Sequence, residues 1–213
     1  MNKLNHVAFI MDGNGRWGEK KGRGRNFGHL KGVETVKKIV ATSIKNNIPY
    51  VTFYVFSSEN WNRPKKEISY LFKLIKNYFE KEIKKIISKG IKLKIFGEIN
   101  GLPSDLKKIL KKSETLTKKN NKIIVNLAIN YGSKNEILNA VKKLKKKINK
   151  RQLEHNLYTK NIPNPDILIR TGGYQRLSNF MLWQLAYAEL FFLKKLWPDF
   201  NSNDLEKILK RYK

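Results

Sequence analysis

The sequence contains no cysteine. Disulfide bridges, thiol nucleophiles and cysteine metal sites are therefore excluded, and the composition is typical of a reducing compartment. Histidine occurs only at positions 6, 29 and 155, and no two histidines have the spacing of metal ligands. No Ser-His-Asp arrangement or paired acid/base carboxylates stand out either. The sequence offers no support for hydrolase chemistry.

Long apolar runs are also missing. The most apolar stretch, residues 180–197, is interrupted by four polar or charged side chains, so a membrane span is not expected there. The N-terminus runs from Met1 directly into a strand-like segment and carries no export signal. With 213 residues, 40% of them hydrophobic, we expect residues 1–213 to form a single domain of a cytoplasmic protein.

Acidic residues are scarce, with 17 Asp and Glu against 45 Lys and Arg and a formal net charge of +28. Such a charge suits nucleic acid, an anionic membrane surface or a phosphorylated substrate, and it does not choose among them. Biased codon usage would produce the same lysine-rich background. The basic run at residues 142–151 is typical of a solvated helix face, with membrane or nucleic-acid contact as the alternatives.

Arginine is rare in this chain and more informative than lysine. Six of the eight arginines lie in or beside loops that contain glycine, proline or asparagine: Arg16, Arg23, Arg25, Arg63, Arg170 and Arg176. A planar guanidinium group binds an oxyanion through two hydrogen bonds, which a lysine ammonium does less specifically. The arginine positions therefore predict oxyanion recognition at loops.

Strand-like and helix-like segments alternate along the chain. The predicted strands are residues 6–11, 50–56, 91–97, 122–130, 167–172 and 189–193. The predicted helices are residues 28–47, 66–88, one that starts at 103–104 with Ser104 as its N-cap, and 133–149. This order predicts an α/β fold with an open, mostly parallel sheet of about six strands and helices on both faces. Ligands bind beyond the carboxyl ends of such strands, so the loops after the first, second and fifth strands should converge.

The loop at residues 12–25 combines several glycines with three arginines and Trp17. Glycines let backbone N–H groups approach an anion, and the helix that follows adds its positive end. The loop therefore predicts a diphosphate site, with a flexible surface loop as the alternative. Asp12, at the end of an apolar strand, would be costly to bury unpaired. Mg²⁺ or an arginine would satisfy it, since Mg²⁺ uses few protein carboxylates beside phosphate oxygens and water; a structural Asp-Gly turn is the alternative.

The other two loops are also polar. Residues 57–64, SSENWNRP, would suit the wall of a polar cleft, or would only organise a turn before the next helix. Residues 169–180, IRTGGYQRLSNF, place two arginines and a serine around a glycine pair, which predicts a second oxyanion site. Two anion sites beside one metal-binding carboxylate suggest that two phosphorylated substrates meet here.

Three stretches resemble the signatures of cis-prenyltransferases of the undecaprenyl diphosphate synthase type. They are residues 6–36, with HVAFIMDGNGRWGEKKG and GRNFGHLKGVETV; residues 53–64, FYVFSSENWNRP; and residues 165–200, PDILIRTGGYQRLSNFMLWQLAYAELFFLKKLWPDF. Their order and spacing match across nearly the whole chain. The resemblance implies Mg²⁺-dependent condensation of isopentenyl diphosphate onto an allylic diphosphate such as farnesyl diphosphate, with release of pyrophosphate. The product would be a long polyprenyl diphosphate, such as the undecaprenyl precursor of the cell-wall carrier lipid.

The resemblance also implies roles for individual residues. Asp12 would bind Mg²⁺, and Asn60 would place isopentenyl diphosphate and handle its proton. The residues that would hold the allylic diphosphate are Gly15, Arg16, Arg25 and His29, and those for isopentenyl diphosphate are Arg170, Arg176 and Ser178. The remaining implied substrate-binding residues are Gly13, Asn14, Trp17, Ser57, Ser58, Glu59, Trp61 and Arg63. Glu189 would lie near the metal or the subunit interface.

By the same resemblance we expect a homodimer with a hydrophobic tunnel between the sheet and its helices, walled partly by the apolar stripe at residues 68–87. Loose peripheral membrane contact is expected and nucleic-acid binding is not. A basic RNA-binding protein and an inactive subunit of a larger enzyme are the competing interpretations. The chain departs from the family pattern at Glu98, at Ser133-Lys134 and at Tyr174, which replace Asp, Gly-Arg and Glu.

Overall fold

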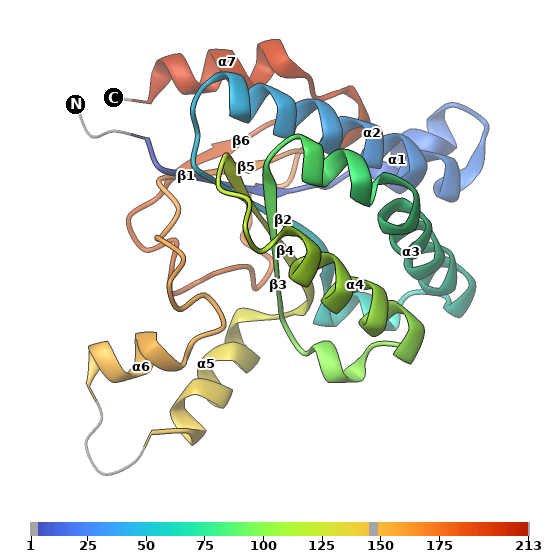
Figure 1. Cartoon of the computed structure of the whole chain (residues 1–213). Helices are drawn as coiled ribbons and strands as arrows, with labels where there is room; N and C mark the ends of the chain where they lie inside the picture. Colours follow the sequence, from blue (N-terminus) through green and yellow to red (C-terminus); the bar gives the residue numbers. More distant parts are fainter. Residues whose placement is uncertain (1–3, 145–148, 213) are drawn as a thin grey trace.

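The computed structural model describes residues 4–144 and 149–212, so residues 145–148 of the basic run at 142–151 lie outside the described part of the chain. The strands are β1 (His6–Ile10), β2 (Tyr50–Ser57), β3 (Ile91–Phe96), β4 (Ile123–Tyr131), β5 (Ile167–Arg170) and β6 (Glu189–Phe192) (Figure 1). The helices are α1 (Asn14–Lys20), α2 (Gly24–Lys45), α3 (Lys65–Ser88), α4 (Ser104–Thr117), α5 (Ser133–Lys142), α6 (Lys150–Asn156) and α7 (Ser202–Arg211). Short 3-10 turns cover Ser58–Asn62, Ile99–Gly101 and Trp197–Asp199.

The strands form one six-stranded sheet in the order β3-β4-β2-β1-β5-β6, and every pairing is parallel. The predicted α/β class, the open sheet and all six strands are therefore confirmed. Because all the strands are parallel, their carboxyl ends lie along one edge of the sheet, which is where the three polar loops emerge.

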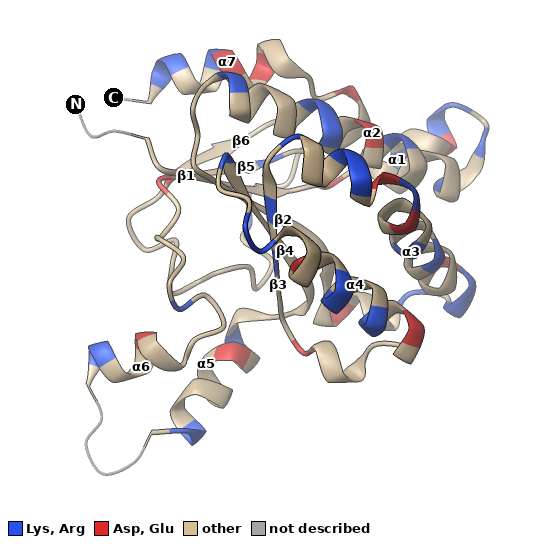
Figure 2. Cartoon of the chain, in the orientation of Figure 1, with Lys and Arg blue, Asp and Glu red and all other residues tan. Residues whose placement is uncertain are grey.

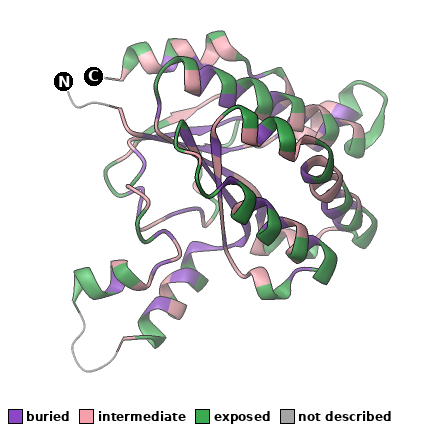
Figure 3. Ribbon diagram, in the orientation of Figure 1, coloured by how far each residue is buried: buried purple, intermediate pink, exposed green. Residues whose placement is uncertain are grey.

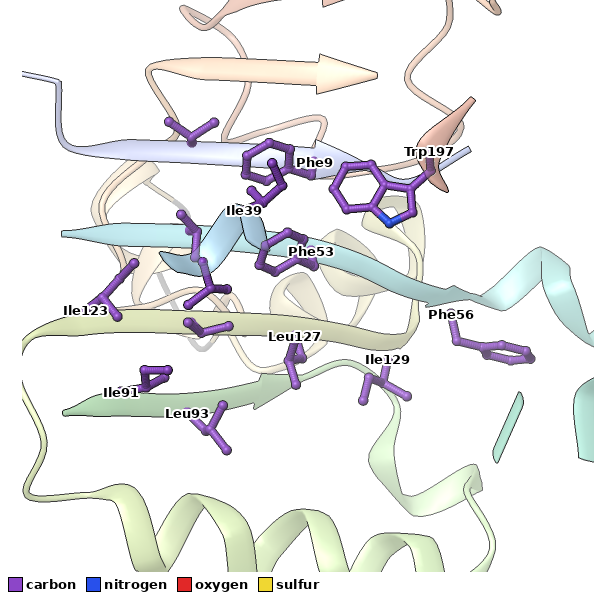
Figure 4. Close-up of a cluster of buried hydrophobic side chains, with 14 of the residues drawn as sticks. Phe9, Ile39, Phe53, Phe56, Ile91, Leu93, Ile123, Leu127, Ile129 and Trp197 are labelled. Atoms are coloured by element: carbon purple, nitrogen blue, oxygen red, sulfur yellow. The ribbon is translucent and has the colours of Figure 1, made fainter. Parts of the chain in front are cut away.

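The larger apolar core lies between the sheet and helices α2, α3, α4 and α7. Phe9 of β1 and Phe53 of β2 stack with ring centroids 5.0 Å apart, and Trp197 packs edge-on against both rings (Figure 4). These side chains are fully or almost fully buried, as is most of the sheet in Figure 3. Burial of an aromatic side chain of this size stabilises the fold by about 2–3 kcal/mol.

The opposite face of the sheet is covered mainly by residues 158–188. Phe180, Met181 and Leu185 of this segment pack on Ala8 of β1 and Leu168 of β5. Helices α5 and α6 pack on each other beside it, through a small cluster of their own (Figure 1). Both faces of the central strands are thus buried, as expected for a parallel sheet.

The prediction of a loop after the first strand is wrong, because residues 14–20 form helix α1. A side chain at Gly28 would place its Cβ 1.8 Å from the carbonyl oxygen of Asn14, and one at Gly18 would meet the carbonyl oxygen of Gly24 at 2.1 Å. These glycines therefore serve the close packing of α1 on α2, a requirement separate from the approach of a backbone to an anion.

Other boundaries also differ from the predictions. Helix α5 stops at Lys142, seven residues before the predicted end, and α6 and α7 were not predicted. Pro103 is the N-cap of α4, so Ser104 is the first helical residue and not the cap. Lys and Arg lie along most of the helices, with fewer acidic residues among them (Figure 2). Within residues 4–144 and 149–212, no helix combines the length and the apolar character needed to cross a membrane.

Candidate active site

Strands β1 and β5 are neighbours, and the chain leaves them on opposite faces of the sheet. The connection after β1 forms α2, whose Ile39 belongs to the same core cluster as Phe9, whereas the connection after β5 covers the face with Ala8 and Leu168. In open α/β sheets this reversal opens a crevice at the carboxyl ends of the two strands. Asp12 follows β1 and Arg170 ends β5, so both lie at the crevice.

Asp12 joins two of the predicted arginines. Its Oδ1 accepts a hydrogen bond from Arg16 at 3.1 Å, and its Oδ2 accepts one from Arg170 at 2.9 Å. The side chain of Arg170 is only 4% exposed, and its Nη1 also donates to Ser178 Oγ at 2.7 Å. The Nε of Arg170 is buried and has no partner in the structure. An unsatisfied buried donor costs about 1–3 kcal/mol, so this N–H group favours a bound acceptor such as a phosphate oxygen.

The β5–β6 connection is bent back toward Asp12 by unusual backbone conformations. Gly172 has a φ of 93°, and its carbonyl oxygen accepts a hydrogen bond from Arg16 at 2.7 Å. A Cβ atom at this position would lie 2.6 Å from Arg16 Nη2, so only glycine fits. Ser178 and Asn179 are also left-handed, with φ of 49° and 60°. Such conformations are costly for side-chain-bearing residues and cluster at functional sites.

A second group of basic side chains surrounds Glu67 on the first turn of α3. Its carboxylate accepts hydrogen bonds from Arg25 at 3.0 Å and from Arg63 at 3.2 Å, and it lies 3.2 Å from His29 Nε2. Glu67 is buried, which raises its pKa, but the hydrogen bonds from Arg25 and His29 outweigh burial and hold the pKa below its usual value. Burial lowers the pKa of His29, so its imidazole is neutral at pH 7. The Nε2–H group of neutral His29 then donates a hydrogen bond to the carboxylate of Glu67.

Glu67 was not among the residues predicted from the sequence, although it lies within the predicted helix at residues 66–88. The available signal was its position four residues after Arg63, because residues at that spacing meet on one helix face. That signal was weak, since Arg63 precedes the helix and Glu67 follows two lysines.

Asn60 and Ser57 sit where β2 runs into a 3-10 turn. The side-chain oxygen of Asn60 accepts a hydrogen bond from the backbone N–H of Ser57 at 3.1 Å, and the two residues form a capping box. This contact fixes the direction of the Asn60 amide, and its NH2 group remains as a donor at the cavity.

A polar cavity of about 240 Å³ joins the two arginine groups. Its walls include most of the predicted site residues: Asp12, Gly13, Asn14, Gly15, Arg16, Arg25, His29, Ser57, Asn60, Arg63, Arg170 and Ser178. The guanidinium group of Arg176 lies beside the cavity, over the ring of Tyr174. Among the residues of 4–144 and 149–212 that line this cavity, Asp12 alone carries a carboxylate.

The remaining predicted site residues do not line the polar cavity. Trp17 stacks on Phe27 and donates to Asp199 at 2.7 Å, so its indole holds α1 in place. The residues that stabilise the neighbouring loops are Ser58, Glu59 and Trp61, of which Glu59 accepts from Asn179 and Trp61 donates to Asn130.

Glu189 does not meet Asp12 within one chain. It is the first residue of β6 and is level with Ile167 of β5 and Val7 of β1, at the end of the sheet opposite the site. Three residues of strand separate Val7 from Ile10, which corresponds to about 10 Å, and two strand spacings add a similar distance sideways. Within one chain Glu189 therefore lies apart from Asp12, and its place near the metal or at the subunit interface stays a prediction.

An apolar cavity of about 370 Å³ adjoins the polar one. The two cavities share the walls formed by Met11, Asn14, His29, Val55 and Leu71. Beyond them the apolar cavity runs between α2, α3 and strands β2 to β4, with Val36, Ile75 and Leu127 among its lining residues. This is the position predicted for the hydrophobic tunnel. The chain therefore places an arginine-lined polar cavity at one end of an apolar one.

The residues around Asp12 fit a magnesium ion that is held mainly by substrate. No group of three or more His, Cys, Asp or Glu side chains in the described residues is arranged to bind a metal. Each Asp12 oxygen accepts one guanidinium N–H and keeps a lone pair, and the side chain is 27% exposed. Mg²⁺ commonly uses one protein carboxylate together with phosphate oxygens and water.

Comparisons with known proteins agree with this geometry. The family model described as "Putative undecaprenyl diphosphate synthase" matches residues 10–213. The isoprenyl transferase of Rickettsia typhi is 41% identical, over 100% of this chain and 96% of its own length. The ditrans,polycis-undecaprenyl-diphosphate synthase ((2E,6E)-farnesyl-diphosphate specific) of Haemophilus influenzae is 44% identical, over 97% of this chain and 91% of its own length.

Two solved structures have the same fold. The lavandulyl diphosphate synthase of Lavandula x intermedia, solved in complex with dimethylallyl diphosphate, superposes with a TM-score of 0.93 at 34% identity and covers 98% of this chain and 94% of its own. A probable undecaprenyl diphosphate synthase from Campylobacter jejuni gives a TM-score of 0.86 at 32% identity and covers 100% and 96%. The chain therefore belongs to the cis-prenyltransferase family, which includes the undecaprenyl diphosphate synthases.

Proposed function

We propose that this protein condenses isopentenyl diphosphate onto an allylic diphosphate, with farnesyl diphosphate as the starter, and repeats the step to make a long polyprenyl diphosphate. The observation that carries the proposal is the polar, arginine-lined cavity at the mouth of an apolar one. A diphosphate ester with a hydrocarbon tail needs both environments. The undecaprenyl chain length is supported by the named activity of the Haemophilus relative.

The two basic groups divide the two substrates between them in this proposal. His29 lies where the cavities meet, and Arg25 lines the polar cavity and shares the carboxylate of Glu67 with His29, so the two residues would hold the allylic diphosphate while its tail enters the apolar cavity. Arg170 and Ser178 would hold isopentenyl diphosphate on the other side of Asp12, with the unpartnered Nε of Arg170 as one donor. Arg16 contacts Asp12 and Gly172 and lines the same polar cavity as Arg25, so it would face a diphosphate held by either group.

In the reaction, the bond between allylic C1 and its oxygen breaks and pyrophosphate leaves. The C4 atom of isopentenyl diphosphate bonds to C1, and a proton is lost from C2 to form the new cis double bond. Arginine side chains that face the leaving group stabilise its developing charge, and holding both substrates close lowers the entropic part of the barrier. Asn60, with its amide direction fixed by Ser57, orients the isopentenyl unit for loss of the proton.

Asp12 would hold Mg²⁺ when the diphosphates are bound. The ion then supplies Lewis-acid stabilisation of the departing pyrophosphate. Asp12 also keeps Arg16 and Arg170 together, because each of its oxygens accepts from one of them.

We further infer that residues 1–213 act as one domain and that two copies form a homodimer through the β6 edge. A single sheet supports the first point. Near β6, Tyr187 is 97% exposed and Leu190 is 44% exposed, and unpaired strand edges with apolar side chains favour association. In such a dimer Glu189 would lie at the subunit interface. Sedimentation velocity would detect the dimer, and a monomer at micromolar concentration would contradict it.

We also infer loose contact with anionic membranes, supported by the +28 charge. Binding to anionic vesicles should fall as salt rises, because screening weakens it. Vesicle binding that is insensitive to both salt and lipid charge would count against this inference.

The test of function is a mixing assay with purified protein, farnesyl diphosphate, labelled isopentenyl diphosphate and Mg²⁺, scored as label in extractable lipid. We expect Mg²⁺-dependent product from the protein alone and a loss of at least about 100-fold for Asp12→Ala, in line with removal of an electrostatic group from a catalytic site. A wild-type protein without product would support the inactive-subunit interpretation. Tight RNA binding in place of activity would support the RNA-binding interpretation.

A further inference from the structure

The aromatic ring of Tyr174 lies beside three guanidinium groups. The Cζ atoms of Arg176, Arg16 and Arg170 are 4.4, 5.0 and 5.8 Å from the ring centroid. All three lie within the distance of about 6 Å at which a cation is attracted to an aromatic ring. Tyr174 is 45% exposed and does not line the polar cavity itself, so its ring lies outside the core and contacts the cavity wall through Arg16 and Arg170.

The three arginines depend on this ring to different degrees. Arg16 and Arg170 are also held by the carboxylate of Asp12. The carbonyl oxygen of Arg176 accepts a hydrogen bond from Arg170. For the guanidinium group of Arg176, however, the Tyr174 ring is the only protein partner within residues 4–144 and 149–212. Loss of the ring would therefore release Arg176 first.

The backbone before Tyr174 is fixed by the neighbouring segment. Gly172 and Gly173 both have left-handed backbone conformations, with φ of 93° and 85°. Their N–H groups donate to the carbonyl oxygens of Lys195 at 2.8 Å and Leu193 at 2.9 Å. The position of Tyr174 is thus set by hydrogen bonds at the end of β6, so the ring can act as a fixed support for the arginines.

The local charge explains why a neutral ring suits this place. Three guanidinium groups and the single carboxylate of Asp12 leave a net charge of +2 when both kinds of group are ionised. Like charges repel one another, so something must hold them together in the absence of ligand. An aromatic ring attracts each cation without neutralising it, whereas the glutamate of the family pattern would pair with the same cations as an ion.

We propose that Tyr174 is a positioning residue that holds arginines of both anion sites at the point where the two diphosphates meet. The identity of these ligands rests on the proposed function, whereas the contacts between the ring and the three arginines are observed in the structure. The resemblance to the family assigns Arg16 to the allylic diphosphate and Arg176 to isopentenyl diphosphate, and the closest contact of the ring is with Arg176. The isopentenyl side should therefore depend more strongly on Tyr174.

The first test measures binding of inorganic pyrophosphate by titration calorimetry, with EDTA present so that no metal contributes. Tyr174→Leu removes the ring, Tyr174→Phe keeps it, and Tyr70→Leu makes the same change at a half-buried tyrosine that lines neither cavity. We expect roughly tenfold weaker binding for Tyr174→Leu, on the order of the three weak contacts together. The Phe variant and the Tyr70 control should remain within about twofold of wild type.

The second test separates positioning from a general structural effect. In the elongation assay, Tyr174→Leu should raise the KM for isopentenyl diphosphate by roughly tenfold. The KM for farnesyl diphosphate should rise less and kcat should change by less than about threefold, because lost substrate binding raises KM without lowering kcat. Equal pyrophosphate binding by wild type and Tyr174→Leu, or failure of Phe to preserve it, would overturn the proposal. A wild-type protein that binds no pyrophosphate in EDTA would also overturn the proposal, whereas only a wild-type protein that forms no lipid product with Mg²⁺ would contradict the proposed function.

Discussion

The buried carboxylate of Glu67 gives the sharpest prediction about the allylic side of the site. Glu67→Gln keeps the size of the side chain but removes the charge that draws Arg25, Arg63 and His29 together. We expect the protein to fold, to lose stability and to bind the allylic diphosphate more weakly.

The magnitude follows from burial. Hydrogen bonds to charged groups contribute about 1.5–3 kcal/mol each, and breaking a buried ion pair costs about 3–5 kcal/mol. The side chains of Arg25 and Arg63 are 43% and 35% exposed, so solvent screens their share, while that of Glu67 is 9% exposed. Glutamine also retains one acceptor oxygen. A loss of about 2 kcal/mol in the free energy of unfolding is therefore expected.

The effect on substrate is positional. Without the carboxylate, Arg25 and Arg63 repel each other and move apart, so we expect the KM for farnesyl diphosphate to rise about tenfold, equivalent to about 1.4 kcal/mol. The KM for isopentenyl diphosphate should change little. Urea denaturation followed by circular dichroism and steady-state kinetics measure the two effects.

Glu80→Gln is the matched control, because Glu80 lies on the same helix but is exposed. It should leave both quantities unchanged. If Glu67→Gln instead lowered the KM for the allylic substrate, the added positive charge of the site would determine binding more than the positions of the arginines. That result would refute the positional role of Glu67.

Three further predictions concern the core, the β5–β6 connection and the apolar cavity. Burial lowers the pKa of His6 to about 4, against about 6.5 when unfolded, so the unfolded state binds more protons and stability is lost as pH falls from 6.5 toward 4. We expect a loss of about 2 kcal/mol between pH 7 and pH 5 in urea titrations, abolished by His6→Asn but not by the exposed control His155→Asn. Gly172→Ala should lower the free energy of unfolding by about 1–3 kcal/mol and, by displacing Arg16, weaken substrate binding. The control Gly22→Ala, at a φ of 66° with open space around it, should leave substrate binding intact. Equal changes in KM for the two variants would contradict this prediction. Ile75→Trp should partly fill the apolar cavity and so shorten the lipid product, as measured by thin-layer chromatography. The KM for isopentenyl diphosphate should stay unchanged. An unaltered product length would show that this cavity does not hold the growing chain.

The sheet could be predicted because its strands are short apolar runs separated by amphipathic helices. Once the strands are parallel, the loops after β1, β2 and β5 must share one edge, so Asp12, Asn60 and Arg170 could be grouped from the sequence alone. The positions of the arginines, which are rare beside the many lysines, predicted that these loops bind oxyanions.

The errors have a common physical cause, which is that sequence spacing does not show what a residue packs against. Gly18 lies in a glycine-rich segment with the sequence pattern of a loop, although its close approach to Gly24 is required by the packing of two helices. Trp17 is predicted in the site because of its neighbours, but it stacks on Phe27 and donates to Asp199, which is 182 positions away. Glu67 and the support of the arginines by Tyr174 depend on contacts between distant segments, which a single sequence does not reveal.

The most direct test of the two-site mechanism is the separate measurement of both KM values in two variants. Arg25→Lys changes the allylic side and Arg170→Lys changes the isopentenyl side, and in each the planar donor is lost while the charge is kept. We predict that Arg25→Lys raises mainly the KM for farnesyl diphosphate and that Arg170→Lys raises mainly the KM for isopentenyl diphosphate. Two variants that raise the same KM, or both KM values equally, would contradict the division of the site into two diphosphate positions.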